Sequence, residues 1–138
     1  MQIKKESKIV VTGGTGFLGS HVLRGLVEKG YSSIYALCRA GSSKDLVSDI
    51  SNSINWIEGD LLDIESLLTL MSGAEYVIHS AAKVSYNPRD SKDVFEINIE
   101  GTANVVNACL TAKTRKLIFI SSVAAIGRIK NGQIIIKE

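Results

Sequence analysis

The sequence has few cysteines, one proline and a small net charge. The cysteine content and the charge each argue against a class of protein. Only two cysteines occur in 138 residues, Cys38 and Cys109, so a disulfide framework is excluded and a reducing, cytoplasmic setting is expected. The formal net charge is only +2, and basic residues are scattered among acidic ones. This balance argues against nucleic acid or a lipid surface as a partner.

Long apolar runs are missing as well. The basic residues near the N-terminus are followed only by Ile9, Val10 and Val11 before a glycine cluster interrupts the run, which is far too short for a signal peptide or a membrane span. No repeat is visible, and the single proline, Pro88, lies in a predicted loop. The length fits one globular domain, which we place at residues 1–127 with a tail at 128–138.

Short apolar runs alternate with helix-like segments along the chain. Strands are predicted at residues 9–11, 33–38, 54–58, 74–79 and 116–120, and helices at about 17–29, 63–71 and 94–112. This alternation is typical of a parallel sheet covered by helices. Right-handed crossovers then predict a doubly wound, Rossmann-type α/β fold with strand order 3-2-1-4-5. Asn131-Gly132 in the tail predicts a hairpin.

A glycine-rich turn, Thr12-Gly13-Gly14-Thr15-Gly16-Phe17-Leu18-Gly19, stands between the first strand and the first helix. A pyrophosphate would meet free backbone N–H groups and the positive helix end there. We expect Gly13 to permit the tight turn, Gly16 to admit the phosphate and Gly19 to let the helix press against the strand. An ordinary strand-to-helix turn is the alternative. No Gly-Lys-Ser/Thr ends the loop, which disfavours a P-loop.

The residue after the second strand bears on which dinucleotide fits. An acidic side chain there would hold the ribose hydroxyl of NAD, whereas an arginine suits the 2′-phosphate of NADP. The sequence has Arg39, with Ser42, Ser43 and Lys44 close enough to add donors and charge. We therefore predict that NADP is preferred, with NAD possible as cofactor. A solvated loop arginine is the alternative, and no metal site is expected.

These segments together resemble the extended short-chain dehydrogenases/reductases, which include NAD-dependent epimerase/dehydratase and dihydroflavonol-reductase-like enzymes. The residues that carry the resemblance are Thr12 to Gly19, Gly59-Asp60-Leu61, His79-Ser80-Ala81-Ala82-Lys83, Asn98-Ile99-Glu100-Gly101-Thr102 and Ser121-Ser122-Val123-Ala124-Ala125. The resemblance implies that the cofactor contacts Thr12, Gly13, Gly16, Phe17, Leu18, Gly19, Asp60, Leu61, Ala81, Ala82 and Lys83, in addition to Arg39 and Lys44.

Individual roles also follow from the resemblance. Asp60 would face the adenine amine, although it could equally be a residue at the start of a helix. Asn98 would tie the long helix to the loop after the fourth strand. Ser122, in preference to Ser121, would hydrogen-bond the substrate oxygen as the one catalytic residue present. His79 is assigned no chemistry.

The chain departs from that family at the tyrosine and lysine that transfer protons. All four tyrosines precede Ser122, and no Tyr-x-x-x-Lys occurs. A phenol with an ordinary pKa of about 10 needs a nearby cation to act near neutral pH. We therefore expect a chain that binds cofactor without turnover, truncated before a sixth strand and the C-terminal lobe that would bind a small-molecule substrate.

Three functions stay open on the residues alone. The first is the NADP(H)-binding portion of an oxidoreductase or a sugar-nucleotide epimerase/dehydratase. The second is a non-catalytic dinucleotide sensor, and the third, which we disfavour, is a structural domain with a vestigial site. In each case the fifth strand would form an uncovered edge, so we expect self-association through that edge or the tail.

Overall fold

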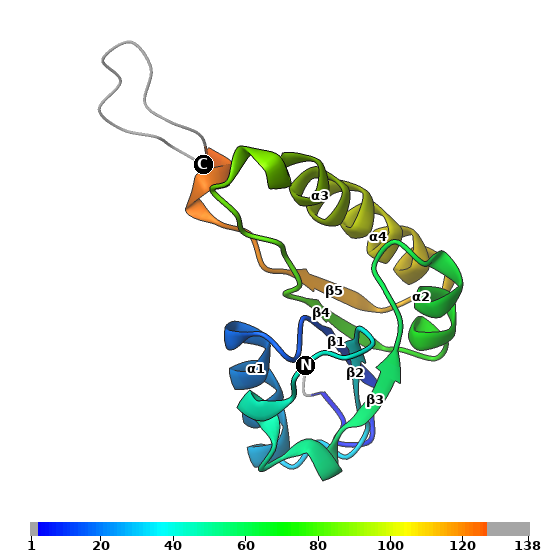
Figure 1. Ribbon diagram of the computed structural model, residues 1–138. Coiled ribbons are helices and arrows are strands. Elements are labelled where there is room, and N and C mark those ends of the chain that lie inside the picture. The colour runs from blue at the N-terminus through cyan, green and yellow to red at the C-terminus, as the bar shows by residue number, and fades with distance from the viewer. Residues whose placement is uncertain (1–2, 127–138) are drawn as a thin grey trace.

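One five-stranded parallel sheet forms the centre of the computed structural model, which describes residues 3–126 (Figure 1). Its strands are β1 (Ile9–Thr12), β2 (Ile34–Cys38), β3 (Asn55–Glu58), β4 (Tyr76–His79) and β5 (Lys116–Phe119). They are ordered β3-β2-β1-β4-β5, which confirms the predicted topology. Each predicted strand lies within two residues of its observed bounds at both ends.

Helices cover both faces of this sheet (Figure 1). They are α1 (Phe17–Glu28), α2 (Ile64–Met71), α3 (Ser91–Phe95) and α4 (Thr102–Thr111). Helix α1 packs on one face, whereas α2 and α4 pack on the other. Gly30 follows α1 with φ +74°, the left-handed conformation expected of a glycine that ends a helix.

The two faces are held by separate apolar clusters that meet at β1. Val10 and Val11 are both fully buried and point to opposite faces, because side chains alternate along a strand. Val10 packs with residues of α2 and α4, and Val11 packs with Leu23 of α1. This double burial explains why the β1 sequence is continuously apolar and not alternating.

The predicted long helix at 94–112 is not a single regular helix. Between α3 and α4, residues Glu96–Gly101 form a π-helical stretch. Gly101 lies so close to Leu61 that a Cβ on it would be 2.9 Å from the Leu61 Cβ, a tertiary contact that sequence periodicity does not report. Short 3-10 turns at Asp45–Val47, Ser51–Ser53, Pro88–Asp90 and Val123–Ile126 were also not predicted.

Two further expectations concern the C-terminal tail and membrane spans. The hairpin predicted at 128–138, like the boundary between residues 127 and 128, lies outside them. Within residues 3–126, no helix combines the length and apolar character needed to cross a membrane.

Candidate functional site

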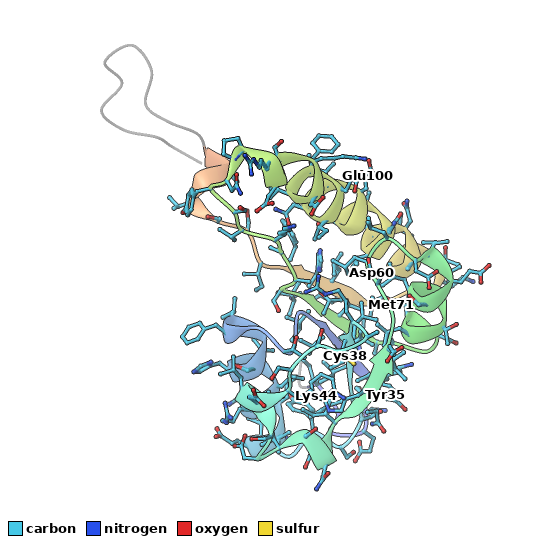
Figure 2. All side chains as sticks on the ribbon, viewed as in Figure 1. Tyr35, Cys38, Lys44, Asp60, Met71 and Glu100 are labelled. Atoms are coloured by element: carbon cyan, nitrogen blue, oxygen red, sulfur yellow. The ribbon has the colours of Figure 1, made fainter. Side chains whose placement is uncertain are left out.

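A cleft of about 310 Å³ opens at the carboxyl ends of the central strands. The predicted cofactor residues that line it are Gly13, Gly16, Arg39, Asp60, Leu61, Ala81, Ala82 and Lys83. Figure 2 labels Cys38 and Asp60, which lie in the middle of the view between α1 and α4. Ligands of open α/β sheets bind at this edge, where the strand order reverses on either side of β1.

Other predicted residues do not line the cleft. Thr12 is fully buried behind it, Gly19 is buried in α1, and the Phe17 and Leu18 side chains are exposed at the start of α1. Five residues that were not predicted also line the cleft, namely Thr15, Leu37, Cys38, Ser80 and Ile97. Thr15 and Ser80 lie within sequence motifs, so their positions in those motifs could have predicted them. No sequence feature indicates Ile97.

The glycine turn is tight, as its sequence predicts, but its close contacts differ in part from those expected. Gly13 has φ +75°, and a Cβ on it would be 2.7 Å from the Ala81 backbone. A Cβ on Gly19 would lie 2.0 Å from the Gly13 carbonyl oxygen, so α1 presses against the turn itself and not against the strand. Gly14, to which no role was given, is the glycine that faces Leu23 and Ala36. Within residues 3–126, no side chain caps the N-terminus of α1, which leaves its backbone N–H groups for an anion.

The loop after β4, residues 80–83, is hydrogen-bonded to the turn. The Ser80 hydroxyl donates to the Thr12 carbonyl oxygen at 2.7 Å, and the Ala81 N–H donates to Thr12 Oγ1 at 3.4 Å. Gly13 and Ala81 therefore lie against one another on the same wall of the cleft. The small side chains at 80–82 make this approach feasible.

Asn98 holds the far end of this loop from the π-helical stretch. Its side-chain oxygen accepts from the Lys83 N–H at 2.8 Å, and its Nδ2 donates to the Lys83 carbonyl at 2.9 Å. The structure thus has the tie between helix and loop that the resemblance implied. Lys83 Nζ also pairs with Asp93 at 2.6 Å, and this ammonium group holds the pKa of the Asp93 carboxyl below its usual value.

The sequence left open whether Asp60 faces the cofactor or starts a helix. Asp63 caps α2, since its side chain accepts from the Glu65 N–H at 3.1 Å. Asp60 lies in the cleft, and its Oδ1 accepts from the Leu62 N–H at 2.9 Å. Asp60 is therefore not the helix cap, and its carboxylate is fixed at the cleft wall by the loop.

The segment after β2 separates Arg39 from Lys44. Arg39 and Ser42 line the cleft, and the Arg39 carbonyl accepts from the Ser42 N–H at 3.0 Å in a tight turn. Lys44 instead places its Nζ 4.8 Å from the centre of the Trp56 ring, a cation–π contact on β3. The cofactor role predicted for Lys44 stays a prediction, and its side chain does not line the cleft.

His79 ends β4 as a buried residue with both ring nitrogens hydrogen-bonded. Its Nδ1 lies 2.6 Å from Thr12 Oγ1, and its Nε2 lies 3.0 Å from Thr102 Oγ1. Burial lowers the pKa of the imidazole below its ordinary value. Both nitrogens of this buried ring are therefore engaged within the protein.

We expect the free energy of unfolding to decrease as the pH falls below about 6.5, the ordinary pKa of histidine. In that range the unfolded chain binds a proton that folded His79 takes up only at lower pH, so protonation favours the unfolded state. Urea unfolding between pH 8 and 5.5 measures this slope. A His79→Gln variant should lack it, whereas His21→Gln, at an exposed histidine of α1, should retain it. Equal slopes in both variants would contradict the assignment.

Ser122 follows β5 at the surface, next to the 3-10 turn at Val123–Ile126. Its carbonyl accepts from the Ala125 N–H at 2.9 Å. Ser122 is not among the residues that line the cleft. Its predicted contact with a substrate oxygen stays a prediction.

Comparisons with known proteins place this arrangement in a family. The NAD dependent epimerase/dehydratase family matches residues 9–137. The 2-alkyl-3-oxoalkanoate reductase of Stenotrophomonas maltophilia is 35% identical over 83% of this chain and 33% of its own length. The human 3 beta-hydroxysteroid dehydrogenase type 7 is 33% identical over 86% of this chain and 33% of its own.

A solved structure gives the same result for the fold. The UDP-glucose 4-epimerase from Brucella ovis, in complex with NAD, is 28% identical, with a TM-score of 0.74 over 93% of this chain and 39% of that one. The chain spans about a third of the length of the curated relatives that it matches. The chain belongs to the NAD dependent epimerase/dehydratase family.

Proposed function

We propose that this chain binds NADP(H) as the cofactor portion of an extended short-chain dehydrogenase/reductase. One observation carries the proposal: the cleft brings the Gly13–Gly16 turn, Arg39 and Asp60 together from three separate segments. Each has a separate task toward a dinucleotide, namely the pyrophosphate, the ribose phosphate and the adenine. The cradle at Gly13 and Gly16 fits such a group, because it exposes backbone where a side chain would exclude phosphate.

The preference for NADP over NAD rests on Arg39. Its guanidinium is the charged group that directly follows β2, where an acidic residue would favour an unphosphorylated ribose. A planar guanidinium can donate two parallel hydrogen bonds to phosphate oxygens. Ser42 lines the same end of the cleft and supplies a hydroxyl donor.

For the whole protein, we propose hydride transfer on a small-molecule substrate. A bound nicotinamide ring supplies the hydride donor or acceptor. Ser122 would hydrogen-bond the substrate oxygen. This chain has no Tyr-x-x-x-Lys to move the proton, so we propose that it does not turn over alone. Relatives named as reductase, dehydrogenase and epimerase leave both oxidoreductase and epimerase/dehydratase chemistry open.

A non-catalytic dinucleotide sensor is the second candidate. The cleft alone suffices for it, since cofactor binding needs neither the tyrosine nor the lysine. A sensor would bind the cofactor with no substrate-dependent change in its redox state. A protein that contains this chain and oxidises or reduces a substrate would exclude the sensor.

Titration of the full 138-residue chain with NADPH and NADH tests the proposal. We expect both dinucleotides to bind, with a lower dissociation constant for NADPH. Equal constants would contradict the NADP preference. A chain that binds neither dinucleotide would contradict the proposed function and revive the vestigial domain.

We also propose self-association through the β5 edge. Ile118, Phe119 and Ile120 are exposed there, and β5 pairs with β4 alone among the described strands. An apolar edge of this kind is a template for pairing with a second chain. Light scattering should show a mass that rises with concentration, and Ile118→Lys should reduce it. A monomeric mass at high concentration would contradict this expectation.

A further inference from the structure

A buried polar chain connects three elements beneath the cleft. Thr12 at the end of β1, His79 at the end of β4 and Thr102 at the start of α4 are linked through the two nitrogens of one imidazole ring. Thr12 and His79 are at most 1% exposed, and they are paired neighbours in the sheet. The Phe119 ring, on the paired residue of β5, has its centre 5.6 Å from that of His79.

The available donors and acceptors determine which way the hydrogen bonds run from Thr12 through His79 to Thr102. Among the contacts of Thr12 Oγ1 in the described residues, the Ala81 N–H can only donate, so His79 Nδ1 is the acceptor for the Thr12 proton. A fully buried hydroxyl needs such an acceptor, which favours an unprotonated Nδ1. A neutral imidazole has one donor and one acceptor, and therefore Nε2–H donates to Thr102 Oγ1. A charged imidazole would turn both nitrogens into donors and break this order.

The position of Thr12 connects this chain to the cleft. Thr12 directly precedes Gly13, and its carbonyl oxygen accepts from both the Ser80 N–H and the Ser80 hydroxyl. Fixing Thr12 thus fixes the glycine turn and the loop at 80–83, the two segments that meet at Gly13 and Ala81. Thr102 follows Gly101, which lies against the cleft residue Leu61.

We propose that His79 is a positioning residue for the dinucleotide. As the Nε2–H tautomer, hydrogen-bonded to Thr12 and Thr102, His79 fixes the glycine turn, the loop at 80–83 and the start of α4 relative to one another. The inference rests on the proposed dinucleotide function. It assigns positioning roles to the half-buried Thr102 and to His79, neither of which lines the cleft. Thr102 and His79 would affect cofactor binding by fixing the backbone of the cleft, without touching the cofactor.

Substitution of Thr102 tests this inference. Thr102→Val keeps the side-chain shape but removes the acceptor of the His79 Nε2–H, so the dissociation constant for NADPH should rise about fivefold. Thr102→Ser restores the hydroxyl and should restore the wild-type constant. Thr111→Val makes the same chemical change at an exposed position at the other end of α4 and should have no effect. Unchanged binding in folded Thr102→Val would overturn the inference.

A second measurement covers a Thr102→Val chain that fails to fold. Nitrogen NMR shifts of the wild-type histidine rings at pH 8, assigned with His79→Gln, report which ring nitrogen carries the proton. We expect Nε2–H for His79, and Nδ1–H would overturn the inference. A wild-type chain that binds no dinucleotide would instead contradict the proposed function, so the two failures are distinguishable.

Discussion

A Gly19→Ala variant is expected to lose NADPH binding and about 3 kcal/mol of stability. The added Cβ would lie 2.0 Å from the Gly13 carbonyl oxygen and 2.9 Å from the Gly14 Cα. Both contacts are with backbone, so no side-chain rotation relieves them. Helix α1 must withdraw from the turn, which removes its N–H groups from the place where a phosphate would bind. Urea unfolding and NADPH titration measure the two effects.

Two other glycines provide matched controls for this substitution. A Cβ on Gly25, in the same helix, would meet nothing within 4 Å, so Gly25→Ala should bind normally and gain up to about 1 kcal/mol. A Cβ on Gly16 would be 3.3 Å from the Gly13 carbonyl oxygen, a contact that a small shift relieves. Gly16→Ala should therefore fold and still fail to bind. Normal NADPH binding in Gly19→Ala would contradict the role given to the turn.

The sequence predicts those parts of the fold whose causes are local. Alternating short strands and helices give the sheet order because parallel strands need crossovers, and the crossovers have one hand. The glycine spacing likewise predicts a strand-to-helix turn, because Gly16 and Gly19 both approach Gly13, within six residues. The cleft residues in this turn and in the loop at 80–83 follow from the same local patterns.

Contacts between distant residues account for what the sequence did not predict. The Lys44 ammonium group lies over the ring of Trp56 in β3, and this contact lies outside the cleft. The π-helical stretch accompanies the close approach of Gly101 to Leu61, 40 positions apart in the chain. His79 meets Thr102 only because β4 and α4 pack together. Leu61, His79, Gly101 and Thr102 stand in sequence motifs, but neither motif nor periodicity indicates which residues contact one another.

An Arg39→Asp variant is expected to reverse the cofactor preference. Hydrogen bonds to charged groups contribute about 1.5–3 kcal/mol, so loss of the guanidinium should weaken NADPH binding by roughly 10- to 150-fold. The new carboxylate would repel the 2′-phosphate but could accept from the ribose hydroxyls of NADH. NADH binding should therefore be retained or improved. The ratio of the two dissociation constants is the measurement, because a loss of folding would lower both affinities together.

Two controls decide whether Arg39 acts by position or merely by charge. Arg89→Asp makes the same change of net charge at an exposed arginine that does not line the cleft, and it should leave the NADPH to NADH ratio unchanged. Lys44→Ala should change the ratio by less than about threefold, since its ammonium group lies over Trp56. If Arg89→Asp shifted the ratio as far as Arg39→Asp, long-range charge would explain the preference. If only Arg39→Asp shifted it, recognition of the 2′-phosphate would belong to the residue that directly follows β2.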